Sequence, residues 1–106
     1  TTSSNAEAAT STQLPSLFSG IGVYFHNVSE EDQKRLKRFI IAFDGDVEKQ
    51  MTHSITHLIT DASTNKLELN DLIKDVKCRV VTPNWLDDCV SEGRLLPTED
   101  YLISLS

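Results

Sequence analysis

The sequence predicts an α/β domain in which a four-stranded parallel sheet lies between layers of helices, in the order β-α-β-β-α-β-α. Two observations predict this class. Short runs of β-branched and aromatic residues alternate with longer segments whose apolar residues recur at helical spacing. Strands that are joined by helical crossovers form parallel sheets covered on both faces. With 106 residues, the chain has room for one such core.

The first strand and helix are expected in the first half of the chain. Residues 21–25 are rich in β-formers and predict the strand. Ser29 is placed to cap the helix, and the three acidic residues after it suit the positive end of the helix dipole. Gly45 is expected to end this helix by taking the left-handed conformation. The apolar stripe of the helix is Leu36, Phe39, Ile40 and Phe43.

Two strands and a second helix are expected in the middle of the chain. Residues 46–50 predict a weak, polar strand that belongs at a sheet edge, and residues 56–60 predict a stronger one. Residues 61–65 form a polar turn before the helix. The helix is marked by four apolar residues, namely Leu69, Leu72, Ile73 and Val76.

The last strand and helix are the most informative part of the sequence. A β-branched strand stops at Thr82, which can cap a helix, and Pro83 suits the first helical position because its missing N–H costs nothing there. Trp85 and Cys89 lie four residues apart, so both are expected to face inward, the indole as a core anchor with the small thiol beside it. Gly93 is placed to end the helix in a left-handed turn.

Composition limits the classes of function. The formal net charge of −6 argues against a domain whose main task is to grip a nucleic-acid backbone, since that task usually requires a basic face. No run of about 18 apolar residues predicts a membrane span, and no leader indicates secretion. Because the first residue is not Met, we expect a piece of a larger protein. Residues 1–13 predict a flexible Ser/Thr-rich linker, for which an inert role is favoured over phosphorylation of its hydroxyls, and residues 14–106 predict the single domain.

The sequence predicts neither catalysis nor a metal or cofactor. The three histidines are scattered along the sequence. The sequence has no metal motif of the His-Glu-x-x-His or Cys-x-x-Cys type, no Gly-rich phosphate loop and no Gly-x-Ser-x-Gly nucleophile motif. His57 is interpreted as a strand residue that bonds to nearby backbone rather than as a general base. Cys78 and Cys89 fall in different predicted elements. A disulfide between them is an open alternative, but the reduced thiols of an intracellular protein are favoured.

Four short motifs occur in order over about residues 14–103. They are Phe18-x-Gly20 before the first strand, Phe43-Asp44-Gly45 after the first helix, Thr56-His57-Leu58-Ile59 in the third strand, and Trp85 to Cys89 followed by Gly93-Arg94-Leu95-Leu96. This ordered set resembles BRCT (breast-cancer-protein C-terminal) domains, although many of these have Gly-Gly where this chain has Asp44-Gly45. The run from Arg38 to Val47 looks most like the single BRCT domains of the single-strand-break repair scaffold and its partner DNA ligase. The resemblance implies a three-layer BRCT fold in a non-catalytic interaction module of a nuclear DNA-repair or checkpoint protein.

The resemblance also implies a phosphate site. BRCT domains that bind phosphoserine usually use a Ser/Thr-Gly pair that ends strand one and a Lys that opens helix two, often with Thr or Ser two residues earlier. Lys66, with Thr64 before it, matches the second position, and a helix N-terminus there favours an anion. His26 and Asn27 replace the first pair. Asn27 can adopt the turn that Gly would, while His26 puts a bulky imidazole in place of the hydroxyl. A merely solvated Lys66 is the alternative, and both stay open.

A second candidate surface is the basic side of the first helix. It carries Lys34, Arg35, Lys37 and Arg38. The i,i+4 pairs Glu30–Lys34 and Glu31–Arg35 predict a solvated, salt-bridged face in which each pair contributes about 0.2–0.5 kcal/mol. The resemblance implies instead a docking patch, since the repair scaffold and ligase domains pair through the region around helix one.

Protein partners are therefore expected, either another BRCT domain or a phosphopeptide, in a homo- or heterodimer. Direct DNA contact should be weak or absent, and no membrane contact is expected. The alternative function is an accessory domain of a repair enzyme, such as a ligase or translesion polymerase, that steers the enzyme to damaged DNA.

Overall fold

The computed structural model describes residues 16–105, and within them it has four strands and three helices. The elements are β1 (Gly22–His26), α1 (Glu30–Ala42), β2 (Asp46–Glu48), β3 (His57–Thr60), α2 (Lys66–Ile73), β4 (Arg79–Val81) and α3 (Asn84–Glu92). The predicted order β-α-β-β-α-β-α is confirmed. The linker predicted over residues 1–13 lies outside the described residues.

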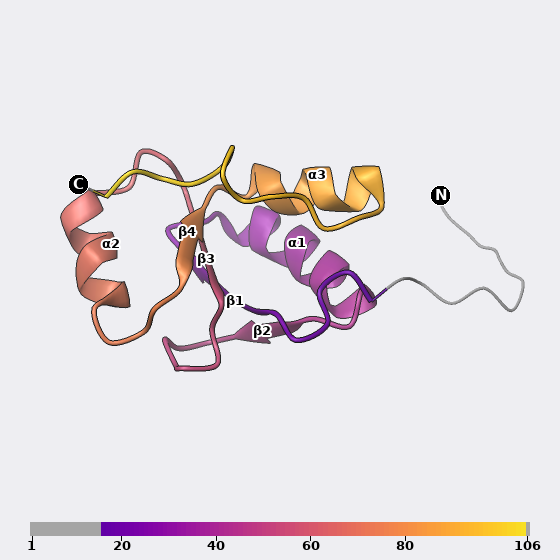
Figure 1. The fold of residues 1–106 in the computed structure, drawn as a ribbon, viewed down its shortest axis with the longest axis horizontal. Helices are drawn as coiled ribbons and strands as arrows, with labels where there is room; N and C mark the ends of the chain where they lie inside the picture. Colours follow the sequence, from indigo (N-terminus) through magenta and orange to yellow (C-terminus); the bar gives the residue numbers. More distant parts are fainter. Residues whose placement is uncertain (1–15, 106) are drawn as a thin grey trace, which may run out of the picture.

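The four strands form one parallel sheet in the order β2-β1-β3-β4, so β2 lies at an edge as predicted. Helices α1 and α3 pack on one face of this sheet and α2 packs on the other (Figure 1). Each face therefore has its own apolar core. The larger one joins Leu36 and Ile40 of α1 to the inner face of α3, and the smaller one is built around Leu58, Leu69 and Val80.

Trp85 anchors the larger core. Its side chain is fully buried, and its Nε1 donates a hydrogen bond of 2.9 Å to the carbonyl oxygen of Leu96. The Leu96 N–H donates in turn to Cys89 Sγ at 3.3 Å, so the indole and the thiol lie together as predicted. The interpretation of His57 was wrong in one respect. Its Nδ1 pairs with Thr56 Oγ1 at 2.8 Å rather than with backbone, and its ring stacks on the indole with centroids 4.6 Å apart.

The helix starts differ in detail from the prediction. Ser29 occupies the N-cap position of α1, but its hydroxyl makes no capping hydrogen bond. Gln33 Nε2 donates to the carbonyl oxygen of Val28 just before the helix, which ties the first turn to the preceding chain. Pro83, rather than Thr82, is the N-cap residue of α3. Pro83 already has helical dihedral angles (φ −65°, ψ −16°), so the turn begins one residue before the helix proper. The prediction that the Thr82 side chain caps this helix was therefore wrong.

Gly45 is required for a different reason from the predicted one. The left-handed residue after α1 is Asp44, with φ of 67°, a conformation that Asp tolerates better than most residues. A Cβ atom on Gly45 would lie 2.6 Å from both Ile40 Cγ2 and Phe18 Cβ. Both of those side chains are fully buried and cannot move away into solvent. Gly93 does take the predicted left-handed conformation, with φ of 73°, where α3 ends.

We expect Gly45→Ala to lower the free energy of unfolding by about 2 kcal/mol, because the new methyl group overpacks a closed core. Urea unfolding of both proteins measures the loss. Gly93→Ala is the matched control. Nothing lies within 4 Å of the Cβ that it adds, so it should cost only about 1 kcal/mol of left-handed strain. A Gly45→Ala protein that is as stable as wild type would contradict the packing explanation.

Cys78 is half-buried and Cys89 is buried, and both are free. Burial raises the pKa of each thiol above its usual value. Residues 16–105 contain no group of three or more His, Cys, Asp or Glu side chains that could hold a metal ion. Within this part of the chain, no helix has the length and apolar character needed to cross a membrane.

Candidate functional site

The residues predicted to bind phosphate gather where β1 and β3 end, at the centre of the sheet. The crossover through α1 leads from β1 to β2 on one side, and the crossover through α2 leads from β3 to β4 on the other. The strand order therefore reverses between β1 and β3. In open parallel sheets, ligands bind outside the carboxyl ends of the strands at such a point. His26, the last residue of β1, is in register with Thr60, the last residue of β3.

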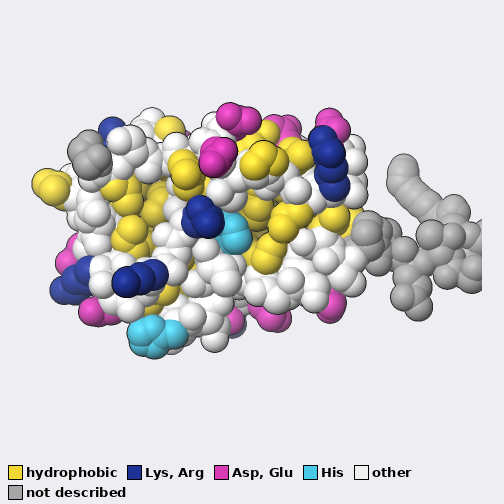
Figure 2. Space-filling view, viewed as in Figure 1, with side chains coloured by type: hydrophobic (Ala, Val, Ile, Leu, Met, Phe, Trp, Pro, Cys, Tyr) yellow, Lys and Arg dark blue, Asp and Glu magenta, His cyan; other side chains and the backbone are white. Residues whose placement is uncertain are grey.

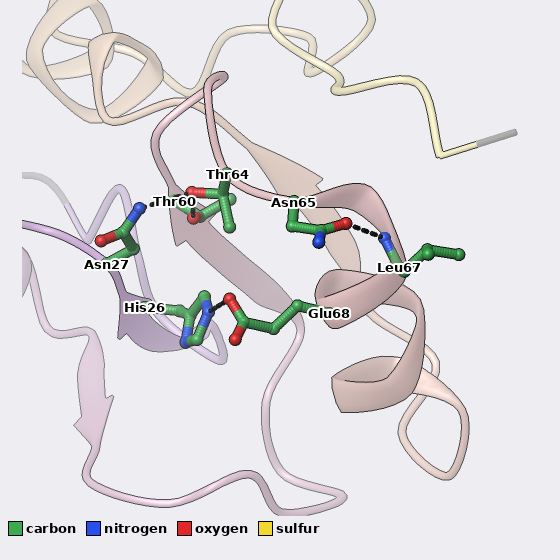
Figure 3. Close-up of polar contacts among 7 residues, drawn as sticks. All are labelled: His26, Asn27, Thr60, Thr64, Asn65, Leu67 and Glu68. Atoms are coloured by element: carbon green, nitrogen blue, oxygen red, sulfur yellow. Dashed lines mark hydrogen bonds and ion pairs between the residues drawn. The ribbon is translucent and has the colours of Figure 1, made fainter.

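A chain of hydrogen bonds fixes Asn27 at this position (Figure 3). Asn27 has φ of 56°, the turn conformation expected of it. Its Nδ2 donates to Thr64 Oγ1 at 2.9 Å, and Thr64 Oγ1 shares a hydrogen bond of 2.8 Å with Thr60 Oγ1. Thr64 is only 6% exposed, so its hydroxyl holds the Asn27 side chain from the protein interior and does not face solvent. The second amide hydrogen of Asn27 stays available to a ligand.

His26 has a partner that the sequence analysis missed. Its Nε2 lies 3.0 Å from Glu68 Oε2, in the first turn of α2 (Figure 3). The register of the parallel strands puts the end of β1 beside the start of α2, and an acidic residue suits that end of a helix. These two signals could have found Glu68, and the strand register alone could have found Thr60. Glu68 brings a negative charge to the place where a phosphate would bind.

Lys66 is the first residue of α2 and is exposed. It forms no ion pair within residues 16–105. The N-terminus of α2 is partly occupied, because the Oδ1 atom of Asn65 accepts a hydrogen bond of 2.9 Å from the Leu67 N–H (Figure 3). One of the helix donors that an anion would use is therefore already satisfied. Lys66 and Asn27 are thus the side chains that bring hydrogen-bond donors to this edge, and Glu68 is the acidic one.

The basic residues of α1 do not form one continuous patch. Lys34, Arg35 and Arg38 line a shallow hollow of about 620 Å³ together with Phe39 and Ala42. Its lining thus combines positive charge with apolar surface, the combination found at many protein contacts.

Lys37 belongs elsewhere. It is half-buried and lines a separate hollow of about 200 Å³ beside β2, with Glu48 and Lys49. The predicted basic face therefore divides into two parts. Lys34, Arg35 and Arg38 share one hollow on α1, and Lys37 lines another beside β2.

The predicted ion pairs Glu30–Lys34 and Glu31–Arg35 were wrong. Arg35 instead pairs with Asp32 at 3.5 Å and reaches Asp87 of α3. The hydrogen bond to Asp87 raises the pKa of the Arg35 guanidinium above its already high value. Arg35 is thus held between Asp32 of its own helix and Asp87 of a neighbouring one, and Glu31 is not among its partners. Within the described part of the chain, Lys34 and Arg38 make no ion pair, so their charge is available to a partner.

Fold and site together define a three-layer α/β domain, in which the carboxyl edge of a central parallel sheet presents polar side chains. A family model described as the DNA ligase 3 BRCT domain matches residues 13–93. The chain belongs to the BRCT family.

Relatives of the chain include much longer proteins. Chromodomain-helicase-DNA-binding protein 1-like from Danio rerio is 32% identical over 96 residues, which are 88% of this chain and 9% of the relative. DNA repair protein XRCC1 from Cricetulus griseus is 27% identical over 90 residues, which are 84% of this chain and 14% of the relative. The chain thus corresponds to a small part of each of these proteins.

Solved structures confirm the fold. The C-terminal BRCT domain of human XRCC1 matches with a TM-score of 0.79 and 23% identity, over 89% of this chain and 99% of that one. Rad4 BRCT1,2 in complex with a Crb2 phosphopeptide matches with a TM-score of 0.66 and 24% identity, over 84% of this chain and 47% of that one. The predicted parallel α/β architecture is therefore that of solved BRCT domains.

Proposed function

We propose that this domain is a non-catalytic adaptor module of a nuclear DNA-repair or checkpoint protein, and that it binds a phosphorylated segment of a partner at the carboxyl edge of its sheet. One observation carries the proposal: at the carboxyl ends of β1 and β3, where the two crossovers lead to opposite sides, Asn27 is fixed in a left-handed turn and α2 begins with Lys66, which is exposed and has no ion pair within residues 16–105. Membership of the BRCT family supports it, as does the phosphopeptide complex of Rad4 BRCT1,2.

The proposed binding mode uses two donors of different kinds. A phosphoserine carries a charge of about −1.5 to −2 at neutral pH, and the Lys66 ammonium supplies the opposite charge. Asn27 supplies a directed N–H because its other amide hydrogen is held by Thr64. The carboxylate of Glu68 repels the phosphate, and His26, which pairs with Glu68, replaces the hydroxyl donor of other BRCT phosphate sites. For both reasons, this domain should bind phosphopeptides more weakly than a domain with a hydroxyl at the position of His26.

We expect Lys66→Ala to weaken binding of a phosphoserine peptide about tenfold, since a charged hydrogen bond contributes about 1.5–3 kcal/mol. The probe is a phosphoserine peptide selected on the wild-type domain from a random library, followed by fluorescence polarisation beside its unphosphorylated form. Lys49→Ala removes an exposed lysine elsewhere and should leave binding unchanged. Glu68→Gln removes the opposing charge and should tighten binding about two- to fivefold. Equal binding of both peptide forms would exclude the phosphate site.

A second contact is proposed at the hollow on α1, with a partner BRCT domain as its occupant. We expect Lys34→Glu combined with Arg38→Glu to abolish association through this surface, because the glutamates that replace the two exposed cations would repel an acidic partner. Sedimentation of the domain, alone and mixed with the DNA ligase 3 BRCT domain, measures the association. Lys66→Ala should leave this association intact. A wild-type domain that stays monomeric and binds no partner would remove α1 from consideration.

The alternative is an accessory domain that steers a DNA-acting enzyme. It is favoured by the family model, which is that of a ligase domain, and by the relative whose name includes a helicase. In that case the domain should bind nicked duplex DNA with a steep dependence on salt, since phosphate contacts release counterions. Binding to protein partners with no measurable DNA affinity at low salt would favour the adaptor function.

A further inference from the structure

We propose that the outer edge of the sheet where β4 begins, formed by the backbone groups of Cys78 and the N–H of Val80, accepts an extended, acidic, non-phosphorylated segment of a partner protein as an added strand. This edge lies at the amino ends of the parallel strands, whereas Lys66 lies beyond their carboxyl ends. The inference therefore does not depend on the phosphate site.

The C-terminal segment covers only one end of this edge. The Thr82 N–H donates to the carbonyl oxygen of Tyr101 at 3.3 Å, and the Ile103 N–H donates to the carbonyl oxygen of Val80 at 3.0 Å. These two bonds flank a single antiparallel bridge between Val81 and Leu102. The segment acts as a very short fifth strand at the carboxyl end of β4.

The segment then leaves the sheet. Asn70 Nδ2 of α2 donates to the carbonyl oxygen of Leu105 at 2.9 Å, which holds this part of the chain against the helix. The Arg79 N–H points inward and bonds to the carbonyl oxygen of Thr56. Because backbone groups alternate along a strand, those of Val80 point outward. The same alternation, continued back to Cys78 directly before β4, turns the backbone groups of Cys78 outward too. Within residues 16–105, the Val80 N–H and both backbone groups of Cys78 make no hydrogen bond.

Two adjoining hollows lie along this open edge, with volumes of about 510 and 460 Å³. Both are lined by Ile73, Cys78 and Arg79, so they form one continuous depression. Figure 2 shows hydrophobic side chains gathered on this face, between α2, β4 and the C-terminal segment, with Lys and Arg side chains around them. The depression has room for an apolar side chain of an added strand.

The rim of the depression determines the charge of the occupant. Lys77 and Arg79 are exposed, and neither forms an ion pair within the described part of the chain. Successive residues of a strand point to opposite sides, so a segment that alternates apolar and acidic residues can fill the depression and meet both cations. A second copy is a poor occupant. A two-fold pairing of β4 edges would bring Lys77 and Arg79 of each copy close to those of the other.

The test uses the whole 106-residue chain, isotope-labelled for NMR. The probe is a pool of non-phosphorylated peptides of about nine residues that alternate Glu or Asp with Leu, Ile, Val or Phe. The control pool has Lys or Arg at the acidic positions. We expect the acidic pool to shift the amide signals of Cys78 and Val80 and to protect the Val80 amide from exchange. Lys77→Glu should weaken binding about tenfold and Lys49→Glu should not, as electrostatic pairing at the rim requires.

A third pool, N-methylated at alternate positions, tests the strand pairing without altering the protein, and it should not bind. Retained binding by this pool, equal binding of acidic and basic pools, or no shift at residues 78–80 would overturn the proposal. Shifts at these residues that depend on protein concentration without peptide would show that a second copy is the occupant. Loss of binding in Lys66→Ala would place the peptide at the phosphate site instead, which separates failure of this inference from failure of the proposed function.

Discussion

Replacing Trp85 with alanine is expected to lower the free energy of unfolding by about 3–5 kcal/mol, the usual cost of emptying a buried aromatic site. The indole is fully buried between Phe18, 6.2 Å away between centroids, and His57, 4.6 Å away. Its removal also leaves the carbonyl oxygen of Leu96 without a donor. The segment after α3 would then lose a fixed point on the core.

Urea unfolding followed by circular dichroism measures this loss, since the variant lacks the only tryptophan of the chain. Trp85→Phe keeps an aromatic ring but removes the Nε1 donor, so it should fall between alanine and wild type. Leu67→Ala is the matched control, because Leu67 is 79% exposed and its truncation should change stability by less than about 0.5 kcal/mol. A Trp85→Ala protein as stable as Leu67→Ala would contradict the role of the indole.

The fold could be predicted because its signals are local and repeated. Helical spacing of apolar residues predicts α1 and α3, and the β-branched pair Val80–Val81 predicts β4. Trp85 and Cys89 had to face the same core once they lay on one helix, four residues apart. Each of these conclusions needs only the residues within one element and the geometry of that element.

What could not be predicted depends on residues that are distant in the sequence. The sequence indicates that Gly45 follows a helix, but not that the Phe18 side chain packs so closely on Gly45 that a methyl group there would have no room. Similarly, helical spacing pairs Glu31 with Arg35, whereas the packing of α3 against α1 offers Asp87 as a competing partner. Such choices are decided by tertiary packing, which no local pattern contains.

The candidate site divides in the same way. The positions of Asn27, Thr64 and Lys66 follow from where β1, β3 and α2 begin and end. The pairing of His26 with Glu68 and the hydroxyl contact of Thr64 with Thr60 required the strand register. These pairings change the chemistry of the site. The His26 ring and the Thr64 hydroxyl are engaged within the protein rather than free for a ligand, and Glu68 adds a negative charge.

The stack of His57 on Trp85 should make stability depend on pH. Burial, and then the positive charge of Arg79, lowers the pKa of His57 from 6.5 to about 4. In the unfolded chain the imidazole takes up a proton near pH 6.5, while in the folded domain it stays neutral down to about pH 4. Between these values the unfolded state binds more protons, so stability falls as the pH is lowered. The loss from this group reaches about 3 kcal/mol near pH 4 and levels off below that pH, once the folded domain takes up the proton as well.

Urea unfolding at intervals from pH 7.5 to about 4 tests this expectation. Several carboxylates also titrate in the lower part of this range, so the informative quantity is the difference from His57→Gln, which cannot take up the proton. His57→Gln should be less stable than wild type at pH 7.5, because it loses the stacked ring. The two stability curves should then converge as the pH falls from 6.5 towards 4. Parallel curves over that range would mean that the imidazole titrates alike in both states and is not held neutral against the indole.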